Sequence, residues 1–243
     1  MKLRFAASLF CGGALALVAT ASHATTIYTS NLSSGSSSSG SAGGYQLDYN
    51  GTITGVTTTG YNFVFTNAAA AVATGANGEY GTVALASVTA NTLDTQDGGA
   101  FLAMDGDFDT SAVDFAINTV AGQTYTVMFD WAATQQTAFS GATTDSLAVA
   151  LGGDVAQDTS TLSIGSQGFS GWDAVTDTFV AGTTGTEELS FLAQGTGEPP
   201  FALLDDIDVS TPSAAPEPSS LMLLGTGLAA LGGFVRMRLK KNA

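Results

Sequence analysis

The chain has 243 residues, 21 of them acidic and six basic, and a formal net charge of −15. Residues 25–215 hold 20 of the carboxylates, all except Glu217, and contain no Lys, Arg, His or Cys. This composition excludes nucleic-acid binding, which needs cations, and nucleophile–histidine catalysis. Zinc sites built from His or Cys and Schiff-base chemistry at lysine are excluded with them.

The N-terminus predicts a signal peptide over residues 1–24. Lys2 and Arg4 form a basic segment, and an uncharged, mostly apolar stretch follows over residues 5–18. Ser22-His23-Ala24 then provides a small-residue cleavage site, with cleavage expected after Ala24 and Ala21 as the alternative. The mature protein is therefore expected outside the cytoplasm and without a thiol, because Cys11 lies in the removed segment.

The region after the signal peptide predicts an all-β domain. Residues 25–44 are expected to form a short strand and a Ser/Gly-rich linker, and residues 45–210 a single β-sandwich domain. Short runs rich in Val, Thr, Phe and Tyr alternate with Gly, Asn and Asp, which is typical of antiparallel strands and turns. The alanines of 67–74 fit either a helical turn or a strand. The expected strands are 52–58, 61–66, 80–88, 100–104, 112–118, 123–131, 145–151, 175–180, 186–194 and 201–210.

The alternation of residues 123–131 is the clearest strand signal. Tyr125, Val127, Phe129 and Trp131 share one face, so Trp131 is expected in the core. Trp172 follows Gly171 in a polar stretch and is the better candidate for an exposed carbohydrate contact, with a loop tryptophan that closes the sandwich edge as the alternative. Phe139 and Phe169 are further candidates for a sugar-stacking platform.

The last expected strand places carboxylates where they need partners. In a regular strand Asp205 shares a face with Phe201, Leu203 and Ile207, where an unpaired carboxylate is costly. No side-chain cation in the domain can pair with it, so a structural calcium ion held by Asp205 and Asp206 is one solution. The alternatives are a bulge at 205–206, backbone hydrogen bonds to Asp205, or its protonation.

The segment 105–109 begins like a calcium-binding EF-hand loop but does not continue as one. It has the spacing D-x-D-x-D, yet Thr110 stands where the turn glycine is required and Ala116 where the bidentate glutamate belongs. The sequence therefore predicts a solvated acidic turn after strand 100–104.

The C-terminus has three parts in a fixed order. After a linker at 211–215 come Pro216, Glu217 and Pro218, then 15 uncharged residues at 221–235, then Arg236, Arg238, Lys240 and Lys241. The prolines keep Glu217 on an extended strip that an enzyme can grip. A helix over 221–235 is about 22 Å long, short of the roughly 30 Å hydrocarbon core, as suits a temporary transmembrane anchor. The basic tail then stays in the cytoplasm.

This arrangement over residues 216–243 resembles the PEP-CTERM sorting signal of Gram-negative bacteria, a segment also catalogued as the ice-binding-protein C-terminal domain. The resemblance implies recognition by an exosortase, cleavage near 216–218, and release or transfer to the cell surface or extracellular matrix. An ordinary tail anchor is the alternative, but it has no need of Pro-Glu-Pro.

Residues 60–210 resemble galactose-binding-like and carbohydrate-binding-module jelly-roll domains. The resemblance rests on the 103–107 turn, the 122–131 strand, Gly171-Trp172 and the Phe201–Ile207 strand with its two adjacent aspartates. It implies an antiparallel two-sheet sandwich, often with a structural calcium ion and often binding sugar through exposed aromatic side chains.

Together these observations predict an exported, non-catalytic protein that is transiently anchored in the inner membrane, is sorted by an exosortase and interacts with exopolysaccharide or another carbohydrate. Two alternatives stay open: a glycoside hydrolase that uses only carboxylates, and a purely structural acidic surface coat.

Overall fold

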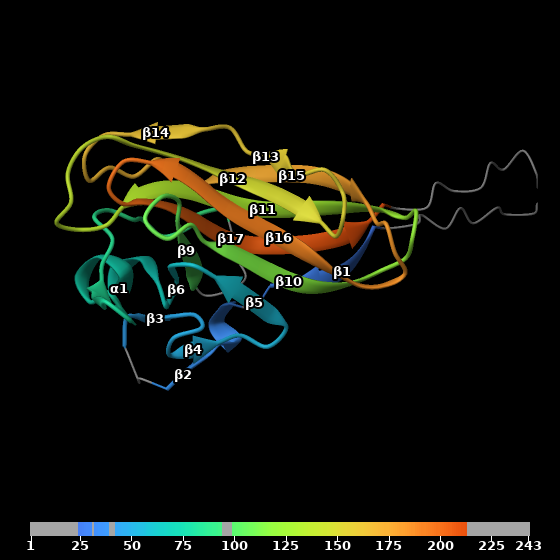
Figure 1. Cartoon of the computed structure of the whole chain (residues 1–243), viewed down its shortest axis with the longest axis horizontal. Helices are drawn as coiled ribbons and strands as arrows, with labels where there is room; N and C mark the ends of the chain where they lie inside the picture. Colours follow the sequence, from blue (N-terminus) through green and yellow to red (C-terminus); the bar gives the residue numbers. More distant parts are fainter. Residues whose placement is uncertain (1–23, 31, 39–41, 94–98, 213–243) are drawn as a thin grey trace, which may run out of the picture. The chain divides into compact units, whose positions relative to one another are not determined.

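The computed structural model describes residues 24–30, 32–38, 42–93 and 99–212, all within the unit Ala24–Pro212. Two large β-sheets account for most of this region (Figure 1). The short elements outside them are the 3-10 helix Leu32–Ser34, the helix α1 (Ala68–Ala73), and the two-stranded sheet of β2 (Ser36–Ser37) and β4 (Gly51–Thr52).

The first sheet has nine strands, and all its pairs are antiparallel except that between β3 and β7. Eight follow the order β15 (Asp173–Val180), β11 (Thr124–Gln135), β17 (Pro200–Thr211), β9 (Phe101–Asp105), β6 (Asn62–Phe65), β3 (Gly44–Gln46), β7 (Ala76–Gly78) and β8 (Gly81–Val83). The ninth, β1 (Thr25–Thr29), pairs with β17.

The second sheet has six strands and is antiparallel throughout. Its order is β13 (Gln157–Asp158), β12 (Thr143–Leu151), β16 (Gly185–Thr196), β10 (Ala112–Thr119) and β5 (Val56–Thr59), and β14 (Leu162–Ile164) pairs with β12.

The two sheets pack face to face through one hydrophobic cluster. The alternating residues of β11 supply Tyr125, Val127, Phe129 and Trp131, as the sequence pattern predicts, and all four are buried. The ring of Phe129 meets that of Phe191, on β16, edge to face at 5.1 Å between centroids. The predicted antiparallel β-sandwich is therefore confirmed.

A second hydrophobic cluster covers the outer face of the first sheet. Phe63, Phe65, Phe101 and Phe201 lie on this face with aromatic centroids 5.6–6.2 Å apart in contacting pairs. The helix α1 packs here through Ala71, which is fully buried. The side chain of Asn67 caps the helix by accepting a 2.8 Å hydrogen bond from the backbone N–H of Ala70. The central strands of the first sheet are thus buried on both faces.

A β-bulge in β17 changes which residues face the core. Opposite Phe129 lie two residues, Asp206 and Ile207, because Met128 pairs with Asp208 but Asp130 pairs with Asp205. Asp206 adopts a positive φ of 47° at this point. The regular register considered for this strand is therefore wrong. A bulge is present, as in the alternative, but at 206–207 rather than 205–206: Asp205 stays on the outer face, while Ile207 turns inward.

Most predicted strands are present, with corrections at several boundaries. The expected strand 52–58 is divided into β4 and β5 around Gly55, which has a positive φ of 77°. The expected strand 80–88 is shortened to β8, and the alanines of 67–74 form a helix. Part of the Ser/Gly-rich segment assigned to the linker forms β2, which pairs with β4. The short strands β3, β7, β13 and β14 were not predicted.

Candidate functional site

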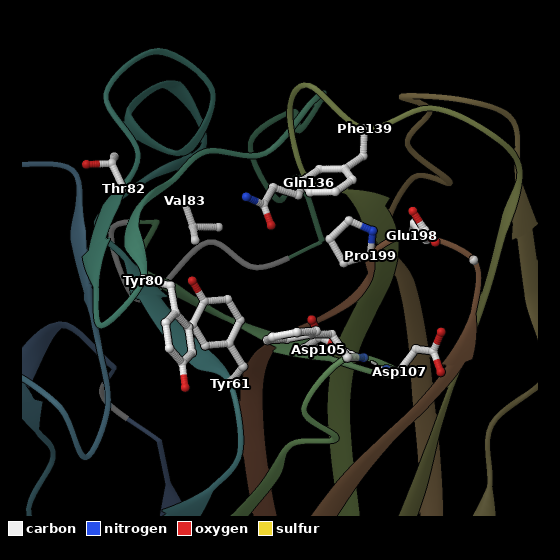
Figure 2. A pocket seen from close by; sticks show the side chains of 12 residues that line it. Tyr61, Tyr80, Thr82, Val83, Asp105, Asp107, Gln136, Phe139, Glu198 and Pro199 are labelled. Carbon is white, nitrogen blue, oxygen red and sulfur yellow. Dashed lines mark hydrogen bonds between the residues drawn. The ribbon is translucent and has the colours of Figure 1, made fainter.

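A cleft of about 530 Å³ opens at one end of the first sheet (Figure 2). The strand register brings the end of β9, the end of β11 and the start of β17 to this point, since Asp105 pairs with Phe201 and Gln135 with Pro200. The loops that leave these strands form the walls. The lining residues are Tyr61, Tyr80, Thr82, Val83, Asp105, Asp107, Phe108, Gln136, Phe139, Gly197, Glu198 and Pro199.

Three aromatic rings form a contiguous surface in the cleft. Tyr61 is buried in the second hydrophobic cluster, whereas Tyr80 and Phe108 are 68% and 70% exposed. The Tyr61 centroid lies 5.8 Å from that of Tyr80 and 6.1 Å from that of Phe108, and the exposed pair is separated by 6.2 Å. Exposed aromatic rings that lie together, rather than singly, form a candidate contact surface for a partner.

Asp105 lies at the base of the cleft and organises the loop that carries Phe108. Its Oδ1 accepts 2.8 Å hydrogen bonds from the backbone N–H groups of Asp107 and Phe108. Its Oδ2 is buried and has no hydrogen-bond partner. Burial raises the pKa of Asp105, although these backbone N–H groups favour the ionised form. Asp107 and Glu198 add two exposed carboxylates to the rim.

The predicted acidic turn at 105–109 is thus present, but its first carboxylate is not solvated. Asp105 is only 1% exposed. The sequence singled out this turn for its carboxylates and missed the aromatic residues of the cleft, Tyr61, Tyr80 and Phe108. The one available signal was Phe108, a large apolar residue inside an acidic turn. Phe139, a predicted candidate, does line the cleft.

Asp145 is a second buried carboxylate, on β12. It shares a face with Leu147 and Val149, which belong to the core between the sheets, and is 1% exposed. Neither of its carboxyl oxygens has a hydrogen-bond partner. Burial, with a further contribution from the charge of Asp105, raises the pKa of Asp145 to about 8.

The two tryptophans lie in different surroundings. Trp131 is 1% exposed and belongs to the core, as predicted. Trp172 is half-buried against Phe101 and Phe169, with centroids 5.8 and 6.3 Å away, and its Nε1 donates to the carbonyl of Thr89 at 3.0 Å. Trp172 thus helps to close the second hydrophobic cluster, and it does not line the cleft.

Asp205 and Asp130 lie directly opposite each other on β17 and β11. Asp205 is 1% exposed and Asp130 6% exposed. The side-chain amide of Asn91 donates to Oδ2 of both, at 3.2 and 3.0 Å, and the backbone N–H of Asp206 donates to Oδ1 of Asp205 at 2.9 Å. The backbone hydrogen bond considered for Asp205 is therefore present.

Two adjacent carboxylates without a cationic side chain between them fit an oxygen-preferring ion such as calcium. Within the described ranges no group of three or more His, Cys, Asp or Glu residues is placed to hold a metal ion. An ion at Asp130 and Asp205 would have to take further ligands from backbone carbonyls, amides or water. Calcium at Asp205 and Asp206 stays a prediction, and Asp130, which lies opposite Asp205, is a further candidate ligand.

The C-terminal residues match the model of the PEP-CTERM protein-sorting motif over residues 214–238. The chain carries a PEP-CTERM sorting motif. Pro216, Glu217 and Pro218, the span 221–235 and the basic residues up to Arg238 fall inside the match, and Lys240 and Lys241 follow it. The motif, the predicted membrane span and the predicted signal peptide lie outside the described residues. Among the residues that are described, no helix is long and apolar enough to cross a membrane.

Comparison with solved structures gives matches at low sequence identity. TmCBM61 in complex with β-1,4-galactotriose is 10% identical, with a TM-score of 0.37 over 65% of this chain and 88% of that chain. The CBM22-1 xylan-binding domain from Paenibacillus barcinonensis Xyn10C is 12% identical, with a TM-score of 0.37 over 81% of this chain and 100% of that chain. A cyclase from Fischerella sp. TAU is 12% identical, with a TM-score of 0.45 over 79% of this chain and 100% of that chain. No curated protein matches the chain.

The buried Asp145 predicts that stability falls as pH rises. The unfolded chain ionises this carboxyl near its ordinary pKa of 3.8, whereas the folded protein keeps the proton up to about pH 8. Stability present at low pH is therefore lost between these values, by at most about 1.4 kcal/mol per pH unit for this group. Asp145→Asn should weaken the dependence and raise stability at about pH 8. Urea unfolding at about pH 5 and about pH 8 measures the unfolding free energy of each variant, with Asp158→Asn, which changes an exposed carboxylate, as the control. If Asp145→Asn leaves the difference in unfolding free energy between the two pH values unchanged, the raised pKa of Asp145 is contradicted.

The carboxylate pair predicts a calcium-specific gain in stability. Millimolar calcium should raise the melting temperature at about pH 8 by mass action on the folded state. Asp205→Asn and Asp130→Asn should each remove most of this gain, whereas Asp158→Asn should keep it. Thermal melts in calcium, magnesium and chelator test the site. Equal responses to calcium and magnesium in the unaltered protein show charge screening and count against a site.

Proposed function

We propose that the chain is an exported, exosortase-processed protein whose β-sandwich binds carbohydrate without catalysis, at the cleft between Tyr80, Phe108 and Glu198. The observation that carries the proposal is the exposure of Tyr80 and Phe108 beside a cleft whose base is rigid. An aromatic face offers a flat apolar surface to the C–H face of a sugar ring, while nearby polar groups bond its hydroxyls.

The cleft is built to hold these rings in place without a ligand. Tyr61 belongs to the buried cluster and contacts both exposed rings, so their positions depend on the core of the sheet. The Phe108 loop is further fixed by its two backbone hydrogen bonds to Asp105. A preformed surface loses little conformational entropy on binding. Gln136 and Glu198 supply hydrogen-bonding groups at the rim.

The chemistry in the cleft favours binding over hydrolysis. Residues 25–215 contain no His, Cys or Lys, so only paired carboxylates could act as acid and base. One observation supports that rival: Asp105 has a raised pKa and shares the cleft with Asp107 and Glu198. However, its Oδ1 is committed to the loop and its Oδ2 is closed from solvent, which leaves no accessible oxygen for proton transfer to a substrate.

Export and sorting complete the proposal. The signal peptide directs the chain across the inner membrane, and the 221–235 span holds it there until an exosortase cleaves near 216–218. The domain then reaches the cell surface or the extracellular matrix, where polysaccharide is the abundant ligand. The PEP-CTERM match supports this route.

Loss of the exposed rings should weaken carbohydrate binding. Phe108→Ala and Tyr80→Ala should each reduce affinity for the producing cell's exopolysaccharide by about 1–2 kcal/mol, roughly five- to thirtyfold. Their unfolding free energies should change by less than about 0.5 kcal/mol, because both side chains are largely exposed. Titration calorimetry gives the affinities.

Two controls locate the binding surface. Tyr49→Ala removes a tyrosine that is 53% exposed and does not line the cleft, so affinity should be unchanged. Trp172→Ala tests the contact predicted from sequence. If only Trp172→Ala loses affinity for the polysaccharide, the carbohydrate surface lies at Trp172 and not at the cleft. If the protein releases reducing sugar from the polysaccharide, its role is hydrolysis and not binding alone.

Processing should remove the tail. The protein recovered outside the cell should end before Leu221, and Glu217→Ala should leave the full chain in the inner membrane. Intact-mass measurement of secreted and membrane fractions tests both statements, with Glu198→Ala as an acidic substitution outside the motif. Secreted protein that retains 236–241 rules out cleavage at this motif.

A further inference from the structure

The cleft combines aromatic faces with carboxylates that no cationic side chain of residues 25–215 neutralises. Asp105, Asp107 and Glu198 line it, and residues 25–215 hold no Lys, Arg or His that could pair with them. Uronic acids, sulfated sugars and phosphorylated sugars would meet only like charge here. A neutral sugar would leave the excess charge uncompensated.

We propose that the sugar bound at this cleft carries free ammonium groups, as in a polymer of amino sugars whose nitrogen is not acylated. The inference rests on the carbohydrate-binding function proposed above and names the class of ligand. An ammonium group suits both kinds of surface in the cleft, because it pairs with carboxylates and is attracted to the face of an aromatic ring.

The aromatic geometry supports this chemistry. The Tyr80 and Phe108 rings are nearly perpendicular, at 89°, and Tyr61 stands at 41° to the first and 75° to the second. Rings in edge-to-face contact cannot all direct their faces the same way, so the cluster presents aromatic faces in more than one direction around the cleft. A cation gains most when it lies over such a face, within about 6 Å of the centroid.

The buried carboxyl group of Asp105, at the base of the cleft, is a second observation. This side chain is 1% exposed, it lines the cleft, and its Oδ2 has no donor. A buried carboxylate oxygen without a donor is costly. Because Oδ2 is closed from solvent, an ammonium group bound in the cleft would act on the Asp105 carboxyl only through space and without direct contact.

Two oligosaccharides of equal length separate this inference from general carbohydrate binding. Titration calorimetry with the full chain would compare a glucosamine tetramer with an N-acetylglucosamine tetramer, near pH 6 so that the amines are charged. The glucosamine tetramer should bind at least about tenfold tighter, and added salt should reduce this difference. Phe108→Ala should weaken its binding.

Matched charge variants separate the cleft from the net charge of the domain. Asp107→Asn with Glu198→Gln removes two exposed carboxylates from the cleft, and Asp158→Asn with Glu188→Gln removes two exposed carboxylates from the second sheet. The cleft pair should lose about tenfold in affinity for the glucosamine tetramer, and the control pair less than about twofold.

Each other outcome has a defined meaning. Equal or tighter binding of the N-acetylated tetramer, lost in Phe108→Ala, overturns the ammonium inference and leaves the carbohydrate function in place. If the cleft pair and the control pair of charge variants lose the same affinity, the preference for the glucosamine tetramer comes from net charge and the ammonium inference is overturned. Binding that a chelator abolishes overturns the ammonium inference as well. If neither tetramer nor the exopolysaccharide responds to Phe108→Ala, the proposed function itself fails.

Discussion

The absence of a cationic side chain between residues 25 and 215 is the constraint on which the rest of this structure depends. A buried carboxylate in this domain has no cationic side chain within residues 25–215 to pair with, so within that range it needs a hydrogen-bond donor, a proton or a ligand. Three solutions are visible. Asp205 accepts from Asn91 and from a backbone N–H, Asp105 accepts two backbone N–H groups at one oxygen, and burial raises the pKa of Asp145 to about 8, which favours its protonated form. The same constraint leaves the cleft purely acidic.

The architecture explains why a cleft with exposed aromatic rings does not destabilise the domain. The first sheet buries both faces, one against the second sheet and the other under α1 and the Trp172 loop. Tyr61 belongs to that second cluster, so the exposed rings of Tyr80 and Phe108 extend a core that is already closed. A surface supported in this way can keep one geometry before a ligand arrives, which lowers the entropic cost of binding.

The sorting motif and the proposed binding cleft occupy separate parts of the chain. The PEP-CTERM motif at 214–238 follows β17, whose last residue is Thr211, so cleavage at 216–218 would remove no strand of the sandwich. The carboxylates and aromatic rings of the cleft all lie before residue 200. Cleavage at the motif would therefore leave every described strand of the sandwich in place.

The sequence by itself determined the sorting motif, the charge of the domain, its all-β class and the burial of Trp131, because each depends on composition, order or local alternation. It could not locate the cleft, since Tyr61, Tyr80 and Phe108 are far apart in the chain and meet only through the register of β6, β9 and the β7–β8 turn. The side of the sheet that Asp205 occupies was likewise undecided, because period-two alternation continues through a strand only until a bulge shifts it by one residue. Tertiary structure decided both: strand pairing set the bulge, and packing brought three distant aromatic rings together.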